Sequence, residues 1–313
     1  MSLRRSATAL TPETEFCLTC NDPLLNGGEV TARLPVSLYE SMREHCERTG
    51  DSVHHVVQKA LAAYLDQEHH TLFQVSTSGA LVEGVYGGCM RVKDILRHGD
   101  FGLGTFDGLD GEGILHDGVC WRAGADGSVH VAPDDALAPF WTVTHFKADR
   151  TLALEGISGW EDLCARIDKA RASDNMFAAV RLRGRFDSLH WRVARKSEER
   201  ADLVSATSTQ AEFRAEGVDG ILVGFWTPTY ARTFNVPGWH LHLLSDDRAY
   251  AGHVLDVHAT KLMAEVHELE QLHVALPETS EFMKADLTKD PAAALAIAEQ
   301  SRGEKRPAPA PAK

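Results

Sequence analysis

The stretch GWHLHLLSDDRAYAGHVLD, residues 238–256, restricts the possible folds of this chain more than any other segment. Polar and apolar residues alternate on both sides of the polar cluster 245–248, as they do in two strands joined by a turn. His240 and His242 lie two residues apart, so in an extended strand both side chains point to the same face. The segment therefore predicts a β-hairpin that carries a pair of histidines on one face.

The expected register of this hairpin adds a third histidine. If the chain folds back about Asp247 and Arg248, His253 lies directly opposite His242 on the same face. Three neutral imidazoles suit zinc and other late first-row metals, and three protein nitrogens with one open position are typical of catalytic zinc. No cysteine follows Cys164, so a closed Cys/His site is not encoded nearby. We expect a metal site open to substrate; the alternative is ordinary strand and turn residues in a chain with 16 histidines.

The composition is that of a globular protein with two or three domains. The chain has 313 residues, of which 43% are hydrophobic and 25% charged. Its formal charge of −13 argues against a general affinity for nucleic acid or anionic lipid. No apolar run is long enough to span a bilayer, and the N-terminal residues lack the pattern of a secretory signal. The six scattered cysteines suit reduced thiols, so we expect a cytoplasmic protein.

The first 69 residues divide into two segments of different character. Residues 1–28 are polar, lack a sustained period and are expected to be a disordered leader. Residues 29–35 alternate as a short strand does, and residues 36–48 carry an apolar stripe at fourfold spacing that predicts a helix. Ser52 is a predicted cap for a second helix that extends to about residue 67. The prediction is a strand-helix-helix module over residues 29–69.

Within this module, TARLPVSLYESMREHCERTGDSVHHVVQKALAAYL resembles the ribbon-helix-helix family over residues 29–66. In that family two copies pair their strands into a ribbon that enters the DNA major groove, and Thr31 and Arg33 would be the outward residues here. The sequence between positions 29 and 70 holds four basic and seven acidic residues, a net charge of −3 that lacks a phosphate-neutralising patch. We therefore expect this module to form a homo-oligomer rather than to bind DNA.

The remainder of the chain predicts an α/β (α+β) fold, with two β-sheet-rich subdomains of mixed or antiparallel strands and flanking helices over residues 70–300. Helices are expected after the Ser158–Glu161 capping box and after Asp290, and the Pro/Ala-rich residues 301–313 read as a disordered tail. The glycines between positions 98 and 112 do not have the spacing of a phosphate-binding loop. The strands include 71–79, 140–146, 176–186, 188–196, 220–228 and 272–278, with 176–186 and 188–196 expected as neighbours.

From about residue 71 to residue 299 the chain resembles the α-acetolactate decarboxylase family. The matching motifs occur in the order of the family: FQVST with GALVEGVYGG, HGDFGLGTFDGLDGE, NMFAAVRLRGRF, WRVA, GFWTPTYARTFNVPGWHLHLLSDDR and AGHVLD. The resemblance implies a metal-dependent enzyme that converts 2-acetolactate to acetoin and CO2. It also implies a two-domain architecture with largely β cores, usually dimeric.

The resemblance assigns roles to individual residues. Zn2+ would be bound by His240, His242 and His253, although another divalent first-row metal is also compatible. The other site residues that it implies are Thr105, Glu112, Arg192 and, after a one-residue gap, Glu299.

The chemistry of this reaction independently requires residues of these types. Loss of CO2 from a 2-hydroxy-3-oxo acid leaves negative charge on an enediolate, which a Lewis acid such as Zn2+ stabilises. Arg192 can hold the departing carboxylate through its planar fork, or it can form a surface ion pair. Glu112 and Glu299 can bind metal, deliver the proton that completes acetoin, or be solvated carboxylates. Thr105 can equally be an ordinary strand threonine.

Two other functions remain open from the sequence. Cupin-type lyases and oxygenases also use H-x-H with a distant histidine, but they want a glutamate three to five residues after the second one, where this chain has Ser245, Asp246 and Asp247. A regulator could instead combine a decarboxylase-like domain that senses acetolactate with a DNA-binding N-terminus. The sequence favours the enzyme, with 2-acetolactate as its small-molecule partner.

Overall fold

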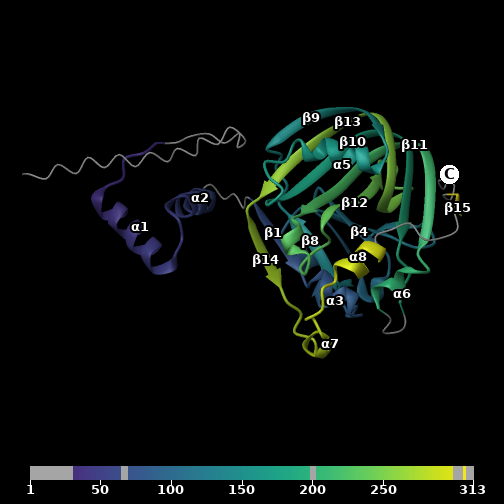
Figure 1. Ribbon diagram of the computed structural model, residues 1–313, viewed down its shortest axis with the longest axis horizontal. Coiled ribbons are helices and arrows are strands. Elements are labelled where there is room, and N and C mark those ends of the chain that lie inside the picture. The colour runs from purple at the N-terminus through teal and green to yellow at the C-terminus, as the bar shows by residue number, and fades with distance from the viewer. Residues whose placement is uncertain (1–30, 65–69, 198–201, 299–305, 308–313) are drawn as a thin grey trace, which may run out of the picture. The chain divides into compact units, whose positions relative to one another are not determined.

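The computed structural model describes residues 31–64, 70–197, 202–298 and 306–307 (Figure 1). The chain divides into two compact units, Met1–Gln67 and Glu68–Lys313, which we call the helical unit and the sheet unit. The predicted leader 1–28 lies outside the described residues, and so does all of the predicted tail 301–313 except residues 306–307.

The helical unit contains the two predicted helices, α1 (Val36–Thr49) and α2 (Val53–Tyr64). Gly50 ends α1 in the left-handed region, at a φ of 82°, and its N–H donates to the carbonyl of Cys46. Ser52 caps α2, because its hydroxyl accepts the N–H of His55 at 3.1 Å. Both helix boundaries thus have the local causes expected from the sequence.

The predicted strand over residues 29–35 is not found in its described part, because residues 31–35 have no regular secondary structure. A strand needs a neighbour for its N–H and C=O groups, and the described part of the helical unit supplies none. Neither helix contains a buried residue, and Leu34, Leu38 and Leu61 are 40, 54 and 47% exposed. Within the described residues of the helical unit, the apolar stripes are therefore uncovered.

The first of the two large sheets in the sheet unit has seven strands in the order β14-β1-β8-β3-β4-β5-β6. Every pairing in it is antiparallel except that of β1 with β14. The strands are β1 (Thr71–Val75), β3 (Phe101–Thr105), β4 (Glu112–His116), β5 (Val119–Ala123), β6 (Val129–Val131), β8 (Phe140–Thr144) and β14 (Gln271–Ala275).

The second large sheet has the order β10-β11-β12-β13-β9, and the short β15 (Arg306–Pro307) pairs with β11. Because β10 pairs with both β11 and β13, these strands and β12 close into a ring. The sequence predicts no regular structure where β15 lies, since backbone pairing leaves no trace in composition. The long strands are β9 (Arg150–Ser158), β10 (Phe177–Val193), β11 (Ala211–Thr227), β12 (Gly238–Ser245) and β13 (Ala251–Leu269).

The prediction of two neighbouring strands at 176–186 and 188–196 is wrong, because β10 runs through both segments as one strand. The polar Asp187 between them is skipped in the pairing with β11, but the strand continues on the same path. A local interruption of the apolar pattern therefore marks an irregularity inside a strand here, and not a turn.

Short helices and a two-stranded ribbon complete the sheet unit. The predicted helix at 158–171 is the shorter α5, which begins after Gly159; the Ser158 N–H is accepted by Asp162 instead of forming the expected box with Glu161. The helix expected after Asp290 is α8, and its first N–H, from Ala292, is accepted by Asp290. The elements are β2 (Met90–Arg91), β7 (Leu137–Ala138), α3 (Ser78–Val82), α4 (Val92–Ile95), α5 (Trp160–Asp168), α6 (Leu203–Thr207), α7 (Ser280–Lys284), α8 (Ala292–Ala298) and the 3-10 turns η1 (Asp107–Leu109) and η2 (Thr229–Ala231).

One hydrophobic core joins the two large sheets. It combines Leu103 and Ile114 of the seven-stranded sheet with residues of β10 to β13 such as Leu222 and Leu241. The predicted α+β fold with two β-rich parts is therefore confirmed, and β12 and β13, which form the histidine hairpin, contact β4 of the seven-stranded sheet. No helix within the described ranges is long and apolar enough to cross a membrane.

Candidate active site

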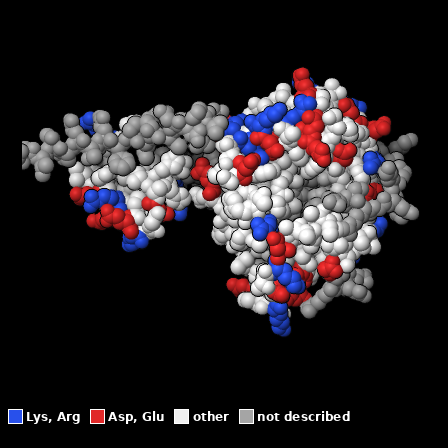
Figure 2. Space-filling model, viewed as in Figure 1, with Lys and Arg blue, Asp and Glu red and all other residues white. Residues whose placement is uncertain are grey.

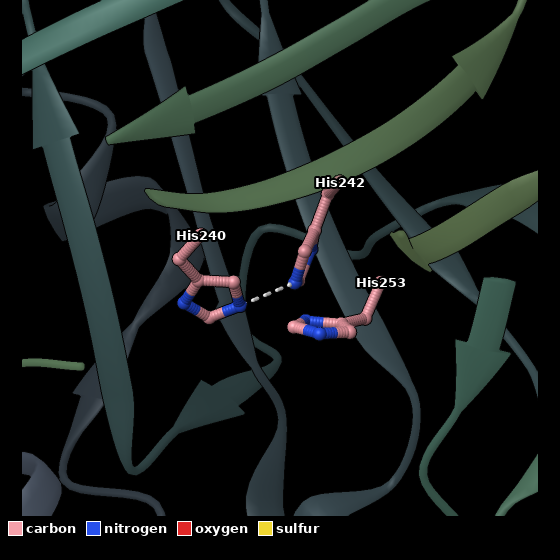
Figure 3. A group of neighbouring side chains, drawn as sticks. All are labelled: His240, His242 and His253. Carbon is pink, nitrogen blue, oxygen red and sulfur yellow. Dashed lines mark hydrogen bonds between the residues drawn. The ribbon is translucent and has the colours of Figure 1, made fainter. Parts of the chain in front are cut away.

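The histidine hairpin forms with the register expected from the sequence. β12 and β13 pair His242 with His253 and Leu244 with Ala251, so the turn falls at Asp247 and Arg248. The two imidazoles of β12 and that of His253 converge, with ring centroids 4.7 to 5.5 Å apart (Figure 3). One potential ligand atom from each histidine lies within 4.8 Å of the others.

The hydrogen bonding of His242 prepares it to bind a metal. Its Nδ1 lies 2.9 Å from the carbonyl oxygen of Gly113, and because a carbonyl only accepts, Nδ1 carries the proton and Nε2 the lone pair. This Nε2 lies 3.1 Å from Nε2 of His240. Burial, and then the neighbouring imidazoles, lower the pKa of His242 well below its usual value, so the ring is neutral. These residues fit a late first-row metal.

An arginine lies in the same row as the histidines. His253 pairs with His242 on one side and with Arg192 of β10 on the other. Directly opposite residues in antiparallel strands share a face, so two imidazoles and a guanidinium follow one another across three strands. The position next to His253 is glycine for a steric reason: a Cβ at Gly252 would lie 2.6 Å from the carbonyl oxygen of Arg192.

The seven-stranded sheet contributes a carboxylate that contacts this arginine and His242. Glu112, at the start of β4, is 6% exposed, and its Oε1 accepts hydrogen bonds from Arg192 Nη1 at 3.3 Å and from the Ala194 N–H at 3.1 Å. Its Oε2 lies 3.6 Å from Nε2 of His242. Glu112 therefore connects the arginine to the histidines across the interface between the sheets.

Thr105 lies beside Glu112, because β3 and β4 pair the two residues directly. Its hydroxyl donates to the carbonyl of Gly111 at 2.7 Å, and Gly111 turns the chain at a φ of 95°. This bond fixes the threonine and also holds the turn that leads into Glu112.

A small cavity of about 60 Å³ is lined by Thr105, Glu112, Arg192, His240 and His242, together with apolar residues. A cavity of this size suits a ligand of a few heavy atoms, with polar groups on one side and alkyl groups on the other. Glu299 lies outside the described residues, but Leu295 and Ala298 of α8, which precede it, line the cavity. The lining residues are Ser78, Leu81, Gly104, Thr105, Leu109, Glu112, Phe140, Arg192, Ala194, Leu203, Thr207, Val236, His240, His242, Leu295 and Ala298.

The sequence does not identify the apolar residues that line the cavity, or the backbone N–H of Ala194 that donates to Glu112. Leu81, Leu109 and Leu203 come from separate short elements with no shared pattern, and the Ala194 N–H has no side-chain signature. His190 of β10 is buried, with its Nε2 2.9 Å from Glu212 Oε2. Three of the motifs quoted for the family resemblance could have indicated part of the apolar wall of the cavity, because they contain Leu81, Leu109 and Val236.

The fold and the site define an α+β protein with a candidate metal centre of three imidazoles beside a buried arginine–glutamate pair. A family model described as alpha-acetolactate decarboxylase matches residues 72–289. The chain belongs to the alpha-acetolactate decarboxylase family. This membership decides against the cupin alternative.

Similar proteins support this assignment over most of their own length. The chain is 41% identical to the alpha-acetolactate decarboxylase of Methanosarcina mazei, over 69% of this chain and 75% of that one. It is 38% identical to the enzyme of Methylococcus capsulatus, over 75% and 91%. The crystal structure of the Bacillus subtilis strain 168 enzyme aligns with a TM-score of 0.72 at 33% identity, over 74% of this chain and all of that one.

Proposed function

We propose that this protein decarboxylates 2-acetolactate to acetoin and CO2, using a divalent metal, Zn2+, held by His240, His242 and His253. The observation that carries the proposal is the convergence of three imidazoles beside Arg192 and Glu112, with His240, His242, Arg192 and Glu112 lining one small cavity. Family membership supplies the reaction, and this geometry supports each role separately.

The histidines suit the metal that the reaction needs. Three imidazole nitrogens leave part of a tetrahedral or five-coordinate shell open to a substrate. A bound Zn2+ supplies Lewis-acid stabilisation for the negative charge that develops on substrate oxygens. The carbonyl of Gly113 keeps His242 in the tautomer that presents Nε2.

Arg192 orients the substrate carboxylate. Its planar guanidinium matches a carboxylate in two-point geometry, and its position next to His253 sets the carboxylate beside the imidazoles. Because Arg192 is 5% exposed, this interaction takes place away from bulk water, where charge attraction is stronger. The arginine therefore aligns the bond that breaks when CO2 leaves.

Glu112 delivers the proton that replaces CO2 on the substrate carbon. Arg192 and the Ala194 N–H fix its Oε1, so the carboxyl group keeps one orientation during the reaction. The hydroxyl of Thr105 and the turn at Gly111 support this position. We assign Glu299 to the same proton transfer, since it directly follows Ala298 in the cavity wall.

The apolar wall excludes water and receives the methyl groups of the substrate. Leu81, Leu203 and Leu295 come from three short helices that cover the cavity. Removing water strengthens the interactions of the buried charges and protects the carbanionic intermediate from unwanted protonation.

We also propose that residues 70–300 carry the activity and residues 29–69 assemble subunits in the cytoplasm. The described cysteines, Cys46, Cys89, Cys120 and Cys164, are free thiols, as is usual in a reducing compartment. Figure 2 shows acidic and basic side chains interspersed on the visible face of the helical unit, which supports assembly over DNA binding.

An acetoin assay on the purified protein tests the proposed function. With 2-acetolactate as substrate, acetoin should form, a strong chelator should stop it, and added Zn2+ should restore it. Absence of acetoin at every metal loading would contradict the proposal, and would favour a domain that senses acetolactate without converting it.

A further inference from the structure

A second group of potential metal ligands lies in the sheet unit, away from the candidate active site. His70, Asp149 and His267 each offer one ligand atom within 4.8 Å of the others. His253 lies near the start of β13 and His267 near its end, so the two groups occupy opposite ends of this strand. His70 also precedes residues 72–289, the segment that matches the family model.

The hydrogen bond of His70 selects the nitrogen that can bind a cation. Its Nδ1 lies 2.7 Å from the carbonyl oxygen of Glu268, so Nδ1 donates and Nε2 carries the lone pair. A metal-binding histidine commonly donates its second ring nitrogen to a backbone carbonyl in this way. His242 has the same arrangement with Gly113 at the first site.

The backbone holds His70 in an unusual conformation. Its φ of 61° lies in the left-handed region, which is uncommon for residues other than glycine, although asparagine, aspartate and histidine occur there more often than the rest. Its carbonyl accepts the N–H groups of both Glu270 and Gln271 at 2.9 Å. Surrounding bonds thus maintain a strained residue with its ring next to that of His267, at a centroid distance of 5.1 Å.

The other two ligands are also fixed by their surroundings. Asp149 Oδ2 accepts the N–H of Glu268 at 2.8 Å, which orients the carboxylate, and the exposed position gives water access to the site. His267 is fully buried, with its ring edge-on to Phe146 at 5.8 Å. The site would thus combine one buried imidazole, one half-buried imidazole and one exposed carboxylate.

We propose that His70, Asp149 and His267 form a second divalent-metal site, of the two-histidine, one-carboxylate type. This ligand set suits Zn2+ and neighbouring first-row metals, with water completing the shell. His70 leads into β1 of the seven-stranded sheet, whereas Asp149 and His267 belong to the β9 and β13 side of the other sheet. A metal here links the two sheets and stabilises the folded state by binding to it.

Metal counting on the purified full-length protein tests this site. After stripping and equilibration with Zn2+, the wild type should hold two zinc ions per chain by elemental analysis. His70→Asn, which removes the imidazole and tolerates the left-handed backbone, should hold one, and so should Asp149→Asn, which keeps an acceptor for the Glu268 N–H. Replacement of the exposed His130 by alanine should leave two.

The two sites can be separated in the same measurement. His240→Ala should also hold one zinc but lose turnover, whereas His70→Asn should keep turnover near that of the wild type. One zinc per wild-type chain that His240→Ala loses and His70→Asn keeps, or equal zinc in the wild type and both His70→Asn and Asp149→Asn, would overturn the second site. Neither result would affect the proposed decarboxylase.

Discussion

His253 is the residue on which the geometry of the first site depends most, because it pairs with both His242 and Arg192. Its replacement by alanine removes one of the three proposed ligands but keeps the backbone pairing with both neighbouring strands. We expect His253→Ala to lose zinc from this site and to lower kcat/KM by about a thousandfold, since Lewis-acid stabilisation contributes several kcal/mol. Elemental analysis and an acetoin assay measure the two effects.

His145→Ala is the matched control for this change. His145 follows β8 and does not line the cavity, so zinc content and turnover should both stay near wild type. If His253→Ala kept the same zinc as this control at the first site, the three-imidazole assignment would be wrong.

Glu112→Gln tests proton transfer apart from metal binding. The amide keeps the shape and one acceptor, but it cannot deliver a proton, so turnover should fall about 100- to 10,000-fold. Zinc content should not change, because the three imidazoles hold the metal. Loss of zinc in Glu112→Gln would instead make Glu112 a ligand.

Glu265→Gln provides the comparison for that variant. Glu265 pairs with Arg181 at 2.7 Å in the same large sheet, but neither residue lines the cavity. Breaking this half-exposed pair should cost little stability and leave turnover near wild type. A comparable loss of turnover would show that breaking an arginine–carboxylate pair outside the cavity also affects activity.

Among individual residues, His240, His242 and His253 were predictable, because side chains in a strand alternate between faces and one turn sets the register of the hairpin. The contact between Glu112 and Arg192 was not predictable from spacing, since it joins β4 to β10 from the other sheet. The resemblance to the family suggested both residues, but the Ala194 N–H that completes the contact is a backbone group.

At the scale of secondary structure, β4 is held close to Trp141 of β8 by a glycine. A Cβ at Gly113 would lie 2.3 Å from the Trp141 ring, which has no room to move in a packed core. Gly113→Ala should destabilise the protein by about 1–3 kcal/mol and, by shifting the carbonyl that holds His242, weaken zinc binding about 10- to 100-fold. Urea unfolding and a zinc-competition titration measure these effects.

Gly79→Ala is the control for this steric argument. Gly79 lies in α3, where an added Cβ meets only ordinary contacts at 3.4 Å or more, and alanine favours helix. Its stability should equal or exceed that of the wild type. Equal stability of the two variants would show that Trp141 does not restrict β4.

The β10–β11 pair contains a buried histidine that should make stability depend on pH. Burial, and then the positive charge of Arg214, lower the pKa of His190, whereas Glu212 and Asp256 act in the opposite direction. As pH falls below about 6.5, the unfolded chain gains a proton that folded His190 does not, so stability decreases.

His190→Gln should therefore reduce the loss of stability between pH 7.5 and 5.5. Urea unfolding with chelator present avoids any contribution from metal binding, and His130→Gln should behave like the wild type. An unchanged pH dependence in His190→Gln would show that its folded-state pKa is not lowered.

The sequence predicted secondary structure well where local signals dominate. The helices that start at Val36 and Val53 and the hairpin of β12 and β13 depend on caps, periodicity and turn residues. The single long β10 and the β10–β13 pairing depend on long-range contacts that no local pattern specifies. The strand over residues 29–35 was predicted from alternation alone, and the described part of the helical unit contains no strand that could pair with it.

At the scale of the whole molecule, the helical unit should be dispensable for catalysis. Every residue assigned to the cavity or to metal lies in the sheet unit, and the stripe of Leu34, Leu38 and Leu61 is exposed within the described residues of the helical unit. A second copy would cover this stripe symmetrically. Deleting residues 1–69 should therefore reduce oligomer size while zinc binding and turnover stay near wild type.

Light scattering and acetoin assays on this truncation test both halves of that prediction. An unchanged oligomer would make the sheet unit the element that dimerises. Salt-sensitive binding of the full-length protein to duplex DNA, lost on truncation, would contradict the preference for assembly over transcriptional control.

The central claim is that metal at the three histidines enables the decarboxylation, and restoring activity to stripped enzyme tests it most directly. Asp149→Asn removes the proposed second site, so this variant should report on the first one alone. We predict that acetoin formation rises in proportion to added Zn2+ and stops rising at one equivalent per chain. Full acetoin formation by the stripped enzyme before any metal is added would contradict the account.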